Sequence, residues 1–164
     1  MPETPVRSGA EPAPTFAELQ RSLQGLLAGE RDLLANTANF AALLYHSLPD
    51  LNWAGWYFLR GQQLVLGPFQ GRPACVRIDM GRGVCGSAAE RRQSIVVPDV
   101  HAFPGHIACD AASRSELVVP ALRADGTLLG VFDLDSPLPG RFTVDDQLGI
   151  ETAVQLLLGA SDGC

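Results

Sequence analysis

The segment ELVVPALRADGTLLGVFDL (residues 116–134) is the part of the sequence that decides the fold class. Residues 116–122 and 128–134 are apolar runs of strand length, and Asp125-Gly126 between them is a strong hairpin-turn dipeptide. The segment therefore predicts an antiparallel hairpin, and we expect the rest of the domain to pack around it.

Strand-like runs separated by turns also fill the region before this hairpin, from Trp53 onward. They predict strands over residues 53–59, 63–69, 74–78 and 94–97, with Gly61 in the turn between the first two. Residues 81–90, which begin with GRGVCG, predict a tight turn that opens a short helix. Residues 100–115 show no period and contain Pro104 and Gly105, so we expect an ordered loop there.

Helices are expected at both ends of the chain. Thr15 can cap a helix over residues 15–29, with Glu18 three residues later as in a capping box. A second helix is expected over residues 30–47, where Leu48-Pro-Asp breaks it. Thr143 and Asp146 begin a last helix in the same way, and its inner side is predicted to carry Leu148, Ile150, Val154, Leu157 and Leu158.

This order of elements predicts an α+β fold. We expect a central, mostly antiparallel sheet flanked by the N-terminal and C-terminal helices on one face. The other face is then left for a ligand or for loops.

Length and composition predict one small domain. The proline-rich residues 1–14 are expected to form a flexible arm, and residues 15–160 a single domain. The net charge is -6 and no basic cluster is present, which argues against a nucleic-acid partner. No apolar run is long enough for a secretory signal or a membrane span, so we expect a cytoplasmic protein without membrane contact.

The four cysteines are Cys75, Cys85, Cys109 and Cys164. In a reducing compartment a structural disulfide framework is disfavoured, which leaves buried small residues, metal ligands or reactive thiols. The first three lie beside glycine or proline in the motifs GPFQGRPAC, GRGVCG and DVHAFPGHIACD, which is typical of loops that carry function. They lack the close pairs of a zinc site, so no metal is expected.

Together with SELVVP (residues 115–120) and DLDS (residues 133–136), these motifs resemble those of the free methionine-(R)-sulfoxide reductases. The resemblance covers residues 52–146, and agreement on all five motifs is highly specific. It implies a GAF-like fold and thioredoxin-dependent reduction of free methionine-(R)-sulfoxide, without a bound cofactor. It also implies that the chain can form a homodimer.

The same resemblance implies roles for the site residues. Cys109 matches the nucleophile, Cys75 a resolving cysteine and Cys85 a third redox cysteine, with the division between the last two left open. Trp53 matches an aromatic wall for the substrate methyl group. The acidic cluster around the substrate matches Glu116, Asp133 and Asp135.

These residue types also fit the chemistry on its own terms. A thiolate has to attack the sulfoxide while a nearby group donates a proton to the oxygen. The resulting sulfenic acid is best protected by a second thiol, and an outside dithiol can reduce the disulfide that forms. One site with two or three cysteines is what such a cycle needs.

The carboxylates allow two readings. Asp133 and Asp135 lie two residues apart on a predicted strand and so share a face. They could pair with the substrate ammonium group and, crowded with Glu116, hold a proton near neutral pH. Alternatively, the two aspartates belong to an exposed polar face of the sheet, and Glu116 at a strand start is solvent-exposed.

Further alternatives concern the histidines, the arginines and the function itself. His101 or His106 could lower the pKa of Cys109, or could be a structural hydrogen-bond bridge. Arg82 and Arg114 could assist the substrate carboxylate. A GAF-type sensor that binds a small molecule without catalysis is the alternative function.

Overall fold

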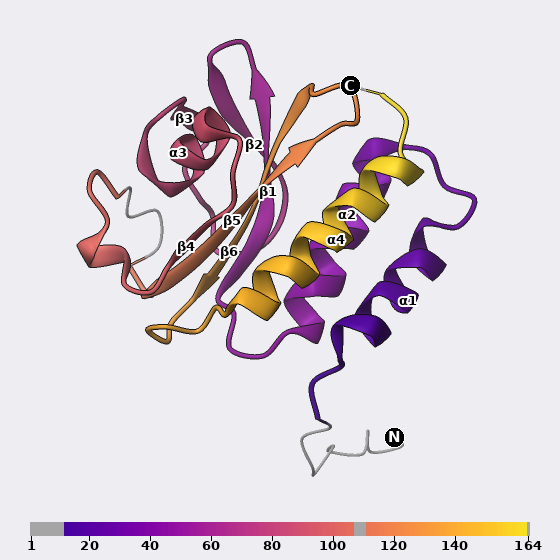
Figure 1. The fold of residues 1–164 in the computed structure, drawn as a ribbon, viewed down its shortest axis with the longest axis horizontal. Coiled ribbons are helices and arrows are strands. Elements are labelled where there is room, and N and C mark those ends of the chain that lie inside the picture. The colour runs from indigo at the N-terminus through magenta and orange to yellow at the C-terminus, as the bar shows by residue number, and fades with distance from the viewer. Residues whose placement is uncertain (1–11, 107–110, 164) are drawn as a thin grey trace, which may run out of the picture.

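The structure is a computed structural model that describes residues 12–106 and 111–163. A six-stranded sheet lies at its centre, with α1, α2 and α4 on one face and α3 on the other (Figure 1). Every strand pair is antiparallel, and the strand order is β3-β2-β1-β6-β5-β4. The strands are β1 (Trp53–Arg60), β2 (Gln63–Gly71), β3 (Arg77–Asp79), β4 (Ile95–Val97), β5 (Ser115–Leu122) and β6 (Leu128–Ser136). The predicted α+β class is confirmed.

The helices begin at the predicted caps or close to them. Helix α1 (Phe16–Leu27) has the predicted capping box, in which Thr15 and Glu18 bond each other's backbone N–H groups. Helix α2 (Leu33–Ser47) starts three residues later than predicted because the side chain of Asp32 caps it. Helix α4 (Val144–Ala160) again has the predicted capping box.

One predicted core residue of α4 is wrong. Leu148 is 54% exposed, whereas Ile150, Val154, Leu157 and Leu158 are buried as predicted. The buried stripe is set by Ile150, and a residue two positions earlier lies about 200° around a helix of 3.6 residues per turn. Leu148 therefore points to solvent.

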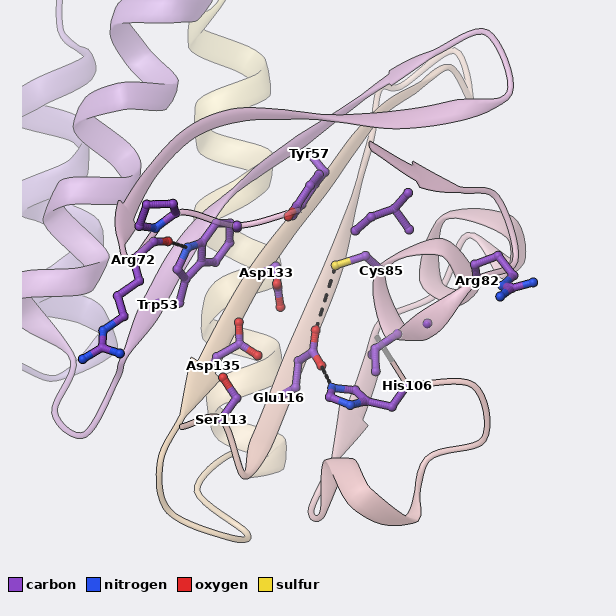
Figure 2. Close-up of a pocket in the computed structure, with 15 residues that line it drawn as sticks. Trp53, Tyr57, Arg72, Arg82, Cys85, His106, Ser113, Glu116, Asp133 and Asp135 are labelled. Carbon is purple, nitrogen blue, oxygen red and sulfur yellow. Dashed lines mark hydrogen bonds and ion pairs between the residues drawn. The ribbon is translucent and has the colours of Figure 1, made fainter. Parts of the chain in front are cut away.

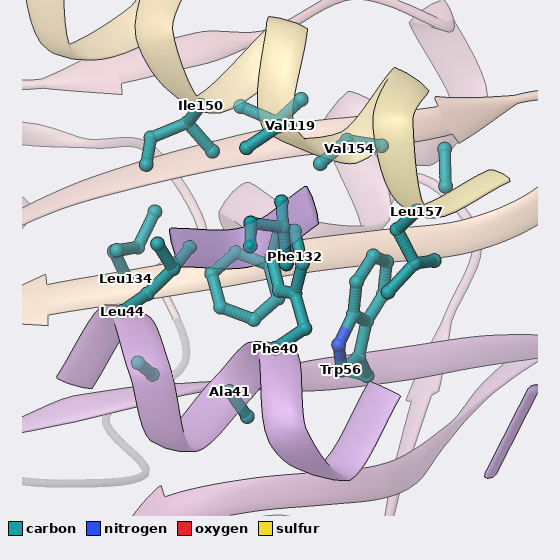
Figure 3. Packing of buried hydrophobic residues seen from close by; sticks show 14 of the residues in the cluster. Phe40, Ala41, Leu44, Trp56, Val119, Phe132, Leu134, Ile150, Val154 and Leu157 are labelled. Carbon is teal, nitrogen blue, oxygen red and sulfur yellow. The ribbon is translucent and has the colours of Figure 1, made fainter. Parts of the chain in front are cut away.

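The helix-facing side of the sheet holds the larger apolar core. Phe40 of α2 packs against Trp56 and Phe132, with ring centroids 5.1 and 4.8 Å away (Figure 3). Ile150, Val154 and Leu157 of α4 cover the same face. Alternation along β1 sends Trp56 into this core and its neighbours Gly55 and Tyr57 to the opposite face.

The opposite face is covered by α3 (Gly83–Arg91), which packs against β5 and β6. Helix α3 packs closely on the turn after β3: a Cβ at Gly86 would lie only 2.4 Å from the carbonyl oxygen of Asp79. Only glycine allows this approach, which places the preceding residue, Cys85, against the sheet.

Two predicted segments differ from the structure. The strand predicted over residues 74–78 is confined to β3, and residues 72–76 form neither helix nor strand. The loop predicted after residue 100 begins with a 3₁₀ turn, Val100–Ala102.

Other predictions are not tested by the described residues. Most of the predicted arm, residues 1–14, lies outside them, and the domain limits 15–160 stay a prediction. Among the helices in the described residues, none is long and apolar enough to cross a membrane.

Candidate active site

A pocket lies between the sheet and α3, on the face opposite the main core (Figure 2). Strands β1, β5 and β6, helix α3, residues 72–74 and the loop that carries His106 contribute to it. The sequence-predicted residues that line it are Trp53, Cys85, Glu116, Asp133 and Asp135. These five side chains come from four separate elements, β1, α3, β5 and β6, and converge at one site.

Strand register places these residues beside one another. Trp53 of β1 pairs with Asp135 of β6, and Asp135 pairs in turn with Glu116 of β5. Directly paired residues of antiparallel strands share a face, with Cβ atoms about 4.5–5.5 Å apart. In the next row of this face, Gly55 pairs with Asp133. The pocket floor is thus a row of aromatic and acidic side chains.

The acidic cluster is buried. Glu116, Asp133 and Asp135 are 5, 6 and 9% exposed, so the alternative of an exposed polar face is wrong. Burial, with the charge of Asp135 adding to it, raises the pKa of Glu116 to about 8. Burial and the charge of Glu116 raise the pKa of Asp133 well above its ordinary value. Carboxyl groups of this site hold protons near neutral pH.

One carboxylate oxygen of the cluster can accept a hydrogen bond from a bound ligand. Oδ1 of Asp133 is buried and has no hydrogen-bond partner within the described part of the chain. An unpaired buried polar atom costs about 1–3 kcal/mol, and a hydrogen-bond donor on a bound ligand would remove that cost.

Cys85 is a free thiol at the end of the pocket formed by α3. It is 4% exposed, and its Sγ lies 3.9 Å from Oε1 of Glu116. Burial, followed by the charges of Asp133 and Glu116, raises the pKa of the Cys85 thiol well above its ordinary value. Because the thiolate is the reactive form, Cys85 is a poor nucleophile in this environment.

The other cysteines are placed only in part. Cys75 is half-buried and disulfide-bonded. Cys109 and Cys164 lie outside the described residues, so the assignment of Cys109 as the nucleophile stays a prediction.

Trp53 lines the pocket with a buried aromatic ring, and its role as a wall for the substrate methyl group stays a prediction. Its indole is 3% exposed and stacks on Phe69 and Tyr57, with centroids 5.3 and 5.9 Å away. The ring needs the space left by Gly55, where a Cβ would lie 2.6 Å from Cη2 of Trp53 and 2.3 Å from Cβ of Phe69.

His106 also lines the pocket, with Nε2 3.7 Å from Oε2 of Glu116. This distance is too long for a hydrogen bond. Burial lowers the pKa of His106 while the pKa of Glu116 is raised, so at neutral pH the two groups meet uncharged. His101 is exposed in the 3₁₀ turn.

The structure separates the two arginines considered from the sequence. Arg82 lines the pocket, whereas Arg114 is exposed and is not among the described residues that line it. Sequence reasoning missed Arg72, Tyr57 and Ser113. Tyr57 could have been found, because it lies four residues after Trp53 on a predicted strand and so shares its face. Arg72 and Ser113 carry no such local signal.

Three of the pocket side chains could hold a metal ion. One ligand atom each of Cys85, Glu116 and Asp133 lies within 4.8 Å of the other two. A thiolate and two carboxylates are ligands that zinc accepts. The expectation that no metal is bound stays a prediction.

Comparison with known proteins places this site in a family. The family model for the GAF domain matches residues 15–159. The free methionine-R-sulfoxide reductase of Escherichia coli is 54% identical over 142 residues, which cover 87% of this chain and 86% of that protein. The chain belongs to the free methionine-(R)-sulfoxide reductase family.

Solved structures of this reductase family share the fold. The reductase from Neisseria meningitidis in complex with its substrate is 41% identical, with a TM-score of 0.84 over 88% of this chain and 87% of that chain. The reduced form of fRMsr of Staphylococcus aureus is 44% identical, with a TM-score of 0.86 over 90% and 96%. The resemblance found in the sequence motifs and the GAF fold are both confirmed.

Proposed function

We propose that this protein, an oxidoreductase by its family, reduces free L-methionine-(R)-sulfoxide to methionine. The observation that carries the proposal is the buried acid cluster, which faces the Trp53 wall in a pocket that also contains a cysteine. A sulfoxide oxygen needs a proton donor, a methyl group needs an apolar wall, and an ammonium group needs a carboxylate. All three kinds of group line this one pocket.

The free amino acid fits the distribution of charge. Two acceptors are offered to the substrate ammonium group: Asp135, paired with Trp53 in the sheet, and Oδ1 of Asp133, which no described residue bonds. Arg72 and Arg82 at the pocket edge are exposed cations and suit the substrate carboxylate. A methionine residue inside a protein has neither charge, which is why we assign the free amino acid as substrate.

We assign the first chemical step to Cys109 and Glu116. The Cys109 thiolate attacks the sulfoxide group, and the protonated carboxyl of Glu116 supplies a proton to its oxygen. The sulfur–oxygen bond of the substrate breaks, and methionine leaves. A new sulfur–oxygen bond forms at Cys109, which loses two electrons and becomes a sulfenic acid that carries the substrate oxygen and the proton from Glu116.

The remaining steps restore the thiols. The Cys75 thiol condenses with the sulfenic acid, so that a sulfur–sulfur bond forms and water leaves. That Cys75 is disulfide-bonded in the structure supports this role. An outside dithiol, for which we propose thioredoxin, then reduces the disulfide by exchange and becomes a disulfide itself. No bound cofactor takes part in this cycle.

Cys85 is not assigned to the attack, because its high pKa keeps it a thiol. Cys85 contacts Glu116 and so lies beside the proposed proton donor. It is available as a second resolving thiol. A Cys85→Ser variant separates these roles, because it keeps a polar hydrogen in the pocket and removes the redox chemistry.

The test measures the methionine that the protein releases from each of the two diastereomers of free methionine sulfoxide. We expect release from free methionine-(R)-sulfoxide with dithiothreitol or thioredoxin, and none from the (S)-sulfoxide or from N-acetylmethionine sulfoxide. Cys109→Ser should release no methionine, and a stoichiometric release in that variant would overturn the nucleophile assignment. Binding of the sulfoxide without turnover would favour the alternative, a GAF sensor without catalysis. Sedimentation and cell fractionation test the predicted homodimer and cytoplasmic location.

A further inference from the structure

Residues 72–76, here called the Cys75 segment, are irregular in structure but are held at three carbonyl groups. Nε1 of Trp53 donates a hydrogen bond of 3.0 Å to the carbonyl of Arg72. The hydroxyl of Tyr57 donates one of 2.9 Å to the carbonyl of Cys75, and the backbone N–H of Leu66 donates one of 2.9 Å to Val76. Two of the three donors are side chains of the pocket wall.

Tyr57 is well suited to be a permanent donor. Its side chain is 2% exposed, and burial, with the charges of Asp133 and Cys85, raises the pKa of the phenol above its ordinary value. The hydroxyl therefore keeps its proton at neutral pH. Its ring packs beside Trp53, so both donors are fixed on β1 (Figure 2).

The resolving step makes a strict geometric demand. A disulfide requires two Cα atoms about 4.4–6.8 Å apart and a sulfur–sulfur bond of about 2.05 Å. A short irregular segment without anchors would hold the Cys75 sulfur at that position only part of the time. Anchors on a rigid strand raise the effective concentration of the thiol beside its target.

We propose that Tyr57 is a positioning residue for Cys75, and that Trp53 holds the other end of the same segment. On this proposal, which rests on the proposed function, the aromatic wall of the substrate pocket also fixes the resolving thiol. Because both donors are side chains of β1, the same strand contributes to substrate binding and to the placement of the resolving thiol. Tyr57 acts through the backbone of Cys75 and takes no part in the chemistry.

The test compares Tyr57→Phe with Tyr45→Phe. The first variant removes the hydroxyl and keeps the ring in the pocket wall. The second makes the same change in α2, on the helix-facing side of the sheet. One net hydrogen bond corresponds to about a 3- to 10-fold change in an equilibrium or rate.

Rapid-quench single turnovers resolve the steps. For Tyr57→Phe we expect disulfide formation to slow by about 3- to 10-fold, and by more than the release of methionine slows. Sulfenic acid should then accumulate, detected as a dimedone adduct by mass spectrometry, and kcat should fall more than KM rises. Tyr45→Phe should match the wild type. Pro73→Gly loosens the Cys75 segment and leaves the Tyr57 ring in place. It should also lower the rate of disulfide formation relative to the rate of methionine release.

The outcomes separate the two proposals. If the wild type releases no methionine, the proposed function fails. If the wild type releases methionine but Tyr57→Phe and Pro73→Gly form the disulfide as fast as Tyr45→Phe does, the positioning role is wrong. If Tyr57→Phe slows methionine release and disulfide formation equally, Tyr57 serves only the pocket wall, and the positioning role is again wrong.

Discussion

Replacement of Glu116 by glutamine should stabilise the protein more strongly as the pH rises. The folded state holds the pKa of Glu116 at about 8, against an ordinary value of 4.5 in an unfolded chain. Between these values the folded state binds the proton more tightly than the unfolded state does. The stabilisation that this proton gives is complete below pH 4.5 and is lost as the pH rises through about 8. Glutamine, which does not titrate, has no such loss.

The magnitude follows from the displacement of the pKa. A full pH unit between the two values removes about 1.4 kcal/mol, and less close to either pKa, so the wild type loses about 3–4 kcal/mol of unfolding free energy between pH 5 and pH 8 through this group. The advantage of Glu116→Gln over the wild type should grow by the same amount. A typical domain has only about 5–15 kcal/mol of stability, so the change is readily measured.

Urea unfolding followed by tryptophan fluorescence at pH 5, 6, 7 and 8, with dithiothreitol present, measures this difference. Glu90→Gln, an exposed position on α3, is the matched control and should follow the wild type at every pH. If the curves of free energy against pH for Glu116→Gln and the wild type run parallel, burial does not hold a proton on Glu116. The assignment of this group as proton donor would then also lose its basis.

Three further predictions test the site and the core. Because the proposed mechanism needs Glu116 protonated, kcat should fall as the pH rises through about 8, and Glu116→Gln should remove that descending limb together with most of the activity. Gly55→Ala should displace Trp53 and weaken substrate binding by about tenfold, measured by calorimetry, with helix content unchanged in circular dichroism. Gly149→Ala places a Cβ 2.2 Å from the ring of Phe16, so thermal unfolding should show a cost of about 1–3 kcal/mol while KM is retained.

Local sequence signals predicted the elements of this fold well. The capping boxes at Thr15 and Thr143 each depend on four consecutive residues, and both are present in the structure. The hairpin turn at Asp125-Gly126 depends on a dipeptide and joins β5 to β6 as predicted. The shared face of Asp133 and Asp135 follows from the period of a strand.

Features set by contacts between distant segments were harder to predict. The burial of Glu116 depends on α3 and the residue 106 region covering its strand, which no local pattern reveals. The limited extent of β3 also reflects a contact between distant segments, because the Tyr57 side chain of β1 bonds the carbonyl of Cys75 within the predicted strand. The acidic cluster was predicted as part of the site from the family motifs, because no local pattern indicates that these three side chains are buried together.

The two faces of the sheet contribute to the free energy of folding with opposite sign, which explains how the protein stays folded with this site. Three buried carboxyl groups, and an Asp133 oxygen that has no partner among the described residues, all oppose folding on the α3 face. The core around Phe40 and Phe132 on the other face is apolar and offsets that cost. The burial that destabilises Glu116 as a carboxylate is also what keeps its proton at neutral pH. Any change that relieves the instability, by hydrating the cluster or by removing its charge, should therefore also remove the proton that the proposed mechanism takes from Glu116.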